Sequence, residues 1–187
     1  MSKKGKMLSS IKFRTPVFRV SFPALFEPKS FEDGPPVYSV TTLFDADADL
    51  SVFEKAVKGV IQDKLNGKRP KKLKVTEIQD GDDIEKKNGD PREECQGKRV
   101  IQLRSKRKPV IVDNYREPIT DPEEVYGGCY ATAIVQAFYW DNKFGSGVSF
   151  DLVALQKIKN GEPFVGSQFA KDDFEEYEDD EDYEDVL

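Results

Sequence analysis

The chain has 187 residues, a length that fits one domain with extensions. It contains 29 lysines and arginines, 35 aspartates and glutamates and no histidine, for a formal net charge of −6. Without histidine, the commonest general base and the commonest metal ligand are missing, and Cys95 and Cys129 alone cannot supply a zinc site. We expect no cofactor, a small core residue at Cys129 and a loop thiol at Cys95.

The N-terminal part predicts two strands. Residues 1–10 are polar and basic, which is typical of a flexible N-terminus. Residues 12–22 alternate and are rich in aromatic and β-branched side chains, so they predict a strand, and Pro16 places it at an edge or a bulge. A loop is expected at 26–36 and a second strand at 37–45.

One helix is predicted at residues 50–65, and Asp47, Asp49 or Ser51 would cap it. Its apolar side chains recur at three- and four-residue spacings: Leu50, Phe53, Val57, Val60, Ile61 and Leu65. The pair at 66–67, Asn-Gly, ends it. Residues 66–97 are charged and glycine-rich with little periodicity, which predicts a long loop or insertion.

Strand patterns resume at 99–104, 109–112, 126–140 and 148–158. A loop is expected at 114–124, a turn at Asp141–Asn142 and a stop at 160–161. About six strands with one substantial helix favour an antiparallel barrel or sandwich. A Greek-key barrel of the oligonucleotide-binding (OB) type has the right size, but the pattern alone does not choose it over a sandwich.

The C-terminal segment is strongly anionic. Residues 171–187 contain eleven carboxylates and one lysine, a net charge of −10, whereas residues 1–170 carry 28 basic and 24 acidic side chains. We therefore expect a net-positive body at 11–165 and a disordered acidic tail at 166–187. Such a tail can imitate nucleic acid and compete for the same surface.

Three stretches of the body are basic and free of acids: 1–20, 64–74 and 98–108. A solvated face is an equally good explanation of any one of them. Three such runs beside a polyanionic tail favour a polyanion as the ligand.

The strand at 129–140 has two distinct faces. Cys129, Ala131, Ala133, Val135, Ala137 and Tyr139 share a mostly small, apolar face suited to a tight barrel interior. Tyr130, Thr132, Ile134, Gln136, Phe138 and Trp140 share an aromatic and polar face suited to base stacking. The alternative is that Phe138 and Trp140 pack under the helix.

Nothing in the sequence indicates catalysis. There is no GxxxxGK(S/T), no HExxH and no histidine-based triad. The Asp80, Asp82 and Asp83 run does not have calcium-loop spacing, and a magnesium-dependent nuclease is only a weak alternative. No signal peptide and no apolar run of membrane-spanning length are present, so we expect a cytoplasmic protein with no membrane partner.

Several ordered motifs resemble a phage single-stranded DNA-binding protein family, formerly a domain of unknown function. They lie at 14–23, 38–43, 118–130, 138–142, 147–152 and 156–163, so the resemblance covers roughly residues 11–165. It implies an OB barrel that coats single-stranded DNA without sequence preference. It also implies an acidic tail that recruits replication proteins such as a polymerase, helicase or recombinase, in the cytoplasm of an infected bacterium.

These patterns and the resemblance together give a set of candidate site residues. The predicted nucleic-acid contacts are Lys12, Arg14, Arg19, Lys98, Arg99, Arg104, Lys106, Arg107, Lys108, Tyr130, Phe138 and Trp140. The predicted partner-recruiting tail is Asp179, Asp180, Glu181, Asp182, Tyr183, Glu184, Asp185, Val186 and Leu187. A homodimer is left open, and the alternative function is a scaffold whose acidic tail is the active part.

Overall fold

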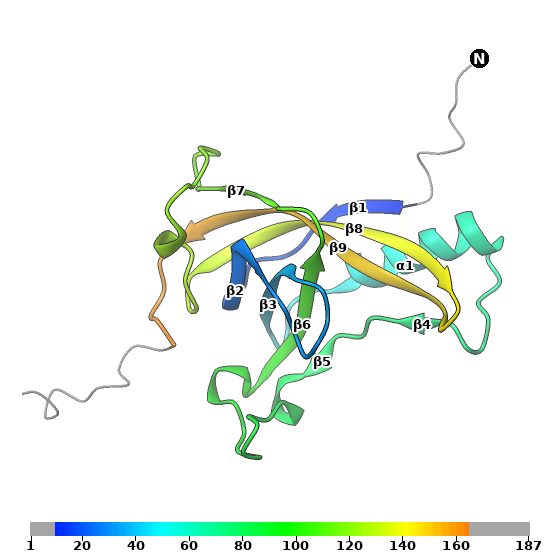
Figure 1. The fold of residues 1–187 in the computed structure, drawn as a ribbon, viewed down its shortest axis with the longest axis horizontal. Coiled ribbons are helices and arrows are strands. Elements are labelled where there is room, and N and C mark those ends of the chain that lie inside the picture. Colours follow the sequence, from blue (N-terminus) through cyan, green and yellow to red (C-terminus); the bar gives the residue numbers. More distant parts are fainter. Residues whose placement is uncertain (1–9, 165–187) are drawn as a thin grey trace, which may run out of the picture.

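The computed structural model describes residues 10–164 (Figure 1). Its long strands are β2 (Phe18–Lys29), β3 (Val37–Asp45), β6 (Lys98–Ser105), β8 (Tyr130–Asn142) and β9 (Gly145–Lys159). They follow one another in the hydrogen-bonded order β8–β2–β3–β6–β9, and β9 pairs with β8 as well as with β6. This double pairing closes the sheet, which decides between the barrel and the sandwich in favour of the barrel.

Short elements border the barrel. β1 (Ser10–Arg14) pairs antiparallel with β8, and β5 (Gln79–Asp80) pairs antiparallel with β6. β4 (Lys74–Val75) and β7 (Val110–Val112) both pair in parallel with β9. Three 3-10 turns complete the described elements: η1 (Gly81–Asp83), η2 (Glu93–Cys95) and η3 (Pro122–Glu124).

The helix α1 (Ser51–Leu65) packs against β1 and β8 through the predicted apolar stripe. Phe53 makes edge-to-face contacts with three core rings, those of Phe13, Phe44 and Phe150, at centroid distances of 5.0, 6.0 and 5.2 Å. The N-cap is Leu50, which makes no side-chain capping bond, and not one of the three predicted residues, although Asp49 Oδ1 accepts a hydrogen bond from the Ser51 backbone N–H at 3.0 Å. Asn66 ends the helix in the left-handed conformation, as its sequence position predicts.

The single strand expected at 12–22 is divided in two. Thr15 keeps a pair of hydrogen bonds to Ala133, through its backbone N–H at 2.9 Å and its Oγ1 at 3.1 Å. Pro16 has no N–H to donate, so the ladder stops there and β2 begins at Phe18.

Other boundaries also differ from the prediction. β2 runs on to Lys29, which pairs with Val37, so the loop expected at 26–36 is shorter. β8 begins at Tyr130 rather than 126 and continues through Asp141 and Asn142, which were expected to form the turn. The turn is instead at 143–144, because Asn142 pairs with Gly145, whose φ of +129° suits glycine.

Residues 66–97 are mostly exposed, and β4, β5, η1 and η2 hold them against the barrel. The expectation of a loop thiol at Cys95 was wrong. This side chain is 2% exposed and packs with Leu43 and Val100, and burial raises the pKa of its thiol. Cys129 is a core residue, as expected.

Candidate nucleic-acid interface

The two faces of β8 have the characters that their alternation predicts. The inner face carries small, buried side chains: Cys129, Ala131, Ala133, Val135 and Ala137. The opposite face is partly exposed. Phe138 and Trp140 lie on this outer face and not under α1, whose ring contacts are with core residues such as Phe13.

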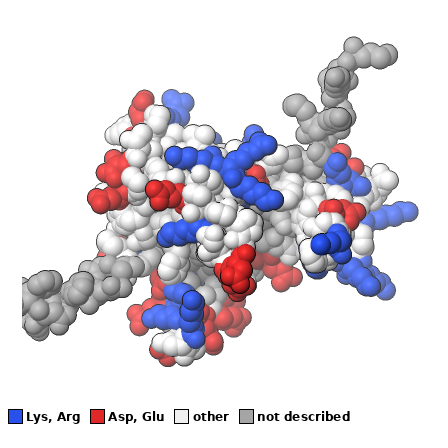
Figure 2. All heavy atoms as spheres, viewed as in Figure 1, with Lys and Arg blue, Asp and Glu red and all other residues white. Residues whose placement is uncertain are grey.

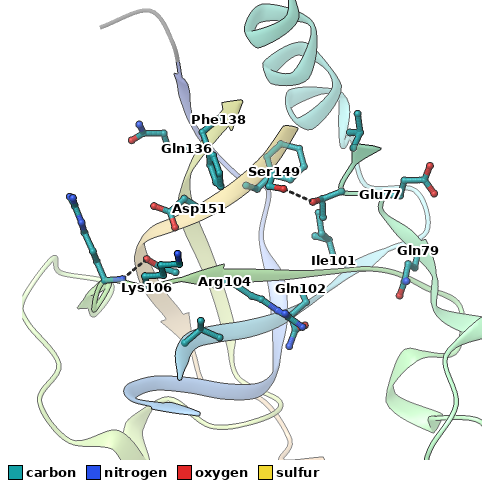
Figure 3. Close-up of a pocket in the computed structure, with 16 residues that line it drawn as sticks. Glu77, Gln79, Ile101, Gln102, Arg104, Lys106, Gln136, Phe138, Ser149 and Asp151 are labelled. Atoms are coloured by element: carbon teal, nitrogen blue, oxygen red, sulfur yellow. Dashed lines mark hydrogen bonds between the residues drawn. The ribbon is translucent and has the colours of Figure 1, made fainter. Parts of the chain in front are cut away.

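A groove of about 1110 Å³ opens on the outside of the barrel, where β6, β8 and β9 meet residues 75–79 (Figure 3). Its cationic side chains are Arg104, Lys106 and Arg107, and its acids are Glu77 and Asp151. The remaining lining side chains are polar or apolar: Thr76, Gln79, Gln102, Ser105, Gln136, Ser149, Val37, Val75, Ile101, Phe138 and Phe150. The groove therefore combines positive charge, hydrogen-bonding groups and one outer-face aromatic ring.

Trp140 is fixed beside this groove. Its indole Nε1 donates a hydrogen bond to Ser149 Oγ at 3.0 Å, and Ser149 also contacts Thr76 Oγ1 at 3.3 Å. A Cβ at Gly147 would come within 2.5 Å of the indole ring, so only glycine lets the ring lie this close to β9. Trp140 and Phe138 point to the same side of β8, about 7 Å apart along the strand.

Arg104 is held at the groove from two sides. Its Nε and Nη2 donate to Gln102 Oε1 at 3.0 and 2.7 Å. Its guanidinium also lies over the ring of Phe31, 5.0 Å from the centroid, although Phe31 belongs to the loop between β2 and β3. Phe31 is thus an additional aromatic side chain close to the groove.

Asp151 places a carboxyl group among these cations. It is the register partner of Arg104 on β6 and of Gln136 on β8. Burial raises its pKa, while a hydrogen bond from Ser105 and the charge of Arg107 oppose that rise. The Arg107 backbone N–H in turn donates to Ser105 Oγ at 3.1 Å, so this corner of the groove is tied together.

The N-terminal strand adds two of the predicted cations to the same face. Lys12 pairs with Gln136 and Arg14 with Ile134 across β1 and β8. Directly opposite residues of an antiparallel pair project to one side of the sheet. Lys12 and Arg14 are both exposed, so they continue the positive charge past the edge of the groove.

The other predicted contacts do not line the groove. Lys98 forms an ion pair with Asp45 at 2.6 Å, and Arg99 is exposed at the start of β6. Lys108 lies 6.0 Å from the Phe26 ring centroid. Basic side chains nevertheless gather across the middle of the face shown in Figure 2.

Arg19 and Tyr130 belong to a separate cluster at the start of β8. Arg19 donates to the backbone carbonyls of Gly128 and Glu162, at 3.2 and 2.7 Å. Its guanidinium lies 4.3 Å from the Phe164 centroid and 5.4 Å from that of Tyr130. These contacts fix the last described residues, from which the chain continues into the acidic segment.

Sequence patterns missed several lining residues. Ser149 and Asp151 alternate with the buried Val148, Phe150 and Leu152. This two-residue period of the last strand could have placed Ser149 and Asp151 on one outer face. Phe31 gave no such signal, because its contact with Arg104 joins two segments far apart in sequence.

Neither a cluster of metal-ligating side chains nor a membrane-spanning helix is found in the part of the chain that the structure describes. Residues 10–164 contain no group of three or more cysteine, aspartate or glutamate side chains placed to hold a metal ion. Asp80 instead accepts from the Asp82 backbone N–H, and Asp82 accepts from that of Gly97. In the same residues, no helix has both the length and the apolar character needed to cross a membrane.

Some sequence predictions concern residues that the structure does not describe. The flexible N-terminus expected at 1–10 lies outside the described residues except for Ser10, the first residue of β1. The acidic tail at 166–187, with its partner-recruiting end at 179–187, lies wholly outside them.

The chain is similar to known phage proteins over most of its length. It is 30% identical over 167 residues to the putative protein p50 of Acyrthosiphon pisum secondary endosymbiont phage 1, covering 86% of this chain and 89% of that one. It is 28% identical to the single-stranded DNA-binding protein of bacteriophage Enc34 solved in complex with ssDNA, with a TM-score of 0.65 over 83% of this chain and 89% of that one.

A more distant structure shares the fold. The single-stranded DNA-binding protein gp2.5 of bacteriophage T7 is 14% identical, with a TM-score of 0.53 over 89% of this chain and 98% of that one. With the Enc34 protein, it confirms the predicted OB-type barrel. The Enc34 protein is named as a single-stranded DNA-binding protein, in agreement with the expectation of a binder and not an enzyme.

The family described as "Enterobacter phage Enc34, ssDNA-binding protein" matches residues 11–184. This match takes in the barrel strands, the helix and the groove, so it extends over all of the described residues except Ser10. The resemblance drawn from the sequence motifs is therefore confirmed, and the chain belongs to the phage Enc34 ssDNA-binding protein family.

Proposed function

We propose that the chain coats single-stranded DNA without sequence preference and binds it in the groove. One observation carries this proposal: Arg104, Lys106 and Arg107 line the same open groove as Phe138, with Trp140 next to it. Cations neutralise phosphates, and aromatic rings stack on every kind of base. Both interactions carry little sequence information, so the binding they produce is general.

The relatives support this assignment. The Enc34 protein, 28% identical over most of both chains, is named as a single-stranded DNA-binding protein and was solved with ssDNA. The groove also lies on the outside of β6, which is the hydrogen-bonded neighbour of β3 in the barrel. This part of the barrel surface is where OB folds bind oligonucleotides. Lys12 and Arg14 would bind phosphates beyond the groove, and Arg19, Lys98, Arg99, Lys108 and Tyr130 stay predicted contacts.

Titration of a labelled oligothymidine at two salt concentrations tests the proposal. A coating protein loses affinity steeply as salt rises, because each neutralised phosphate releases counterions. The scaffold alternative gives no specific binding of single strands at either concentration. Incubating DNA with the protein and magnesium or manganese tests the nuclease alternative, and we expect intact DNA.

We further propose that the acidic tail competes with DNA and recruits replication proteins during replication, recombination or repair in the infected bacterial cytoplasm. Arg19 fixes the chain at Phe164, and 23 residues follow. Fully extended, they span at most about 80 Å. The distance along β8 from Tyr130 to Phe138 is only about 27 Å, so the tail is long enough to reach the groove.

A further inference from the structure

The basic run at 64–74 has no part in the groove, yet it adjoins it directly. Val75 and Thr76 line the groove, and the four residues before them are Lys71, Lys72, Leu73 and Lys74. β4 holds this segment in place, because Lys74 pairs with Gly147 and Val75 with Val148 of β9. The groove wall and the lysines therefore belong to one continuous segment of the chain.

These cations are exposed and not neutralised by the described acids. Lys68, Arg69, Lys71, Lys72 and Lys74 are all exposed. Within residues 10–164, the ion pairs are made by other cations, namely Lys58, Arg92 and Lys98. In Figure 2, basic side chains gather at the side of the molecule where β4 and the end of α1 lie in Figure 1.

The tip of the β8–β9 hairpin adds an aromatic ring to this region. The Lys74 ammonium donates to the Phe144 backbone carbonyl at 3.2 Å, which ties the basic run to the tip. Phe144 is 73% exposed, and the Lys143 ammonium lies 5.1 Å from its ring centroid. An exposed ring beside cations offers a second place for a base and its phosphate.

We infer that residues 68–74 and the tip residues Lys143 and Phe144 form a second binding site, which extends the path of a single DNA strand beyond the groove. Trp140 lies between the two sites, because it precedes the tip on β8 and its indole donates a hydrogen bond to Ser149, which lines the groove. This inference rests on the proposed function of the groove. It predicts that a strand must exceed a minimum length before it reaches the second site.

Affinity as a function of oligothymidine length tests the inference. The wild-type protein and a Lys71→Ala/Lys72→Ala variant are titrated with a series from the shortest oligonucleotide that binds to several times that length. For long strands, we expect the variant's slope of log K against log salt to be shallower by about 0.7 for each phosphate that it no longer neutralises, or about 1.4 for two. For the shortest strand, the two slopes should agree.

Lys86→Ala/Lys87→Ala is the matched control. It removes the same charge from another exposed part of the 66–97 segment. The control lysines lie in the segment that leads into the start of β6, whereas the groove cation Arg104 lies near the end of β6. For this control, we expect the same slope of log K against log salt as for the wild type at every oligothymidine length. Phe144→Ala gives a second readout, a reduction of roughly 5- to 150-fold in affinity for long strands only.

The results of these titrations separate the two proposals. If the wild type binds no oligothymidine of any length, the groove assignment is wrong. If short strands bind but Lys71→Ala/Lys72→Ala matches the wild type at every length, the extended path is wrong and the groove stands. Equal reductions in affinity for short and long strands would also overturn the extension, since they would reveal a general effect of charge.

Discussion

The guanidinium of Arg104 lies over the ring of Phe31, 5.0 Å from its centroid, and so joins the β2–β3 loop to the groove. The interaction adds to the two hydrogen bonds from Arg104 to Gln102 and further restricts this cation at the place where we propose that phosphates bind. An exposed cation–π interaction contributes about 0.5–1 kcal/mol.

Phe31→Ala should therefore weaken binding of oligothymidine by about two- to fivefold, because the Arg104 guanidinium no longer has a ring to rest on. Phe31→Tyr keeps the ring and should bind as the wild type does. Anisotropy titrations of both variants make the comparison, and an unchanged Phe31→Ala affinity would show that Arg104 does not depend on this ring.

Trp140 is expected to stack on a base. It is the only tryptophan, so its fluorescence should be quenched when oligothymidine is added. Trp140→Ala should weaken binding by about 1–3 kcal/mol. Trp140→Phe, which keeps a ring but not the hydrogen bond to Ser149, should be weakened less. A folded Trp140→Ala protein with wild-type affinity would leave Trp140 as a structural neighbour of the site only.

Lys106 and Arg107 are expected to bind phosphates. Lys106→Glu/Arg107→Glu should lower affinity for all sequences alike and flatten the salt slope by about 0.7 for each phosphate that is no longer neutralised. Lys55→Glu/Lys58→Glu on the exposed side of α1 is the charge-matched control. Equal slopes for the groove variant and the wild type would mean that these two cations are merely solvated.

Asp151 should make DNA binding depend on pH. Burial raises its pKa, so it gains a proton at a higher pH than an ordinary aspartate does. As pH falls toward that raised pKa, the groove loses a negative charge and affinity should increase. Asp151→Asn should bind more tightly at neutral pH and show a smaller change in affinity between pH 7 and pH 5.

The same group should affect stability with a definite sign. A carboxyl whose pKa is raised by folding destabilises the native state above that pKa. This effect fades as pH falls through the folded pKa and is absent below the unfolded value. Asp151→Asn should thus raise the free energy of unfolding more at pH 7 than at pH 4, as measured by urea denaturation. The reverse order would contradict the raised pKa.

Deleting residues 171–187 should raise affinity for single strands, most clearly at low salt, where screening is weak. The deletion removes eleven carboxylates tethered to a net-positive body, where they reach an effective concentration in the millimolar range. The truncated protein should still fold, since it keeps every residue of the described core. If low-salt affinity did not change, competition by the tail would be wrong, while recruitment of partners would stand as a separate proposal.

Local patterns were sufficient for much of the fold. The stripe from Leu50 to Leu65 predicted α1 almost to the residue, because helical spacing is a local property. The alternation at 129–140 separated the core face of β8 from its outer face for the same reason. The predicted strand boundaries were wrong where pairing with another strand decides them. Lys29 is an example, because its pairing with Val37 of β3 extends β2 beyond the predicted end.

Composition and local spacing were enough to predict the charge division between body and tail, the helix, the period of the strands and the family motifs. These depend on neighbouring residues or on composition. Three further features became visible only in the folded chain: β9 pairs with both β6 and β8, Phe31 contacts Arg104, and Asp151 lies among the groove cations. Such interactions join segments far apart in the chain. Their free energy comes from packing and burial, which a local sequence pattern does not predict.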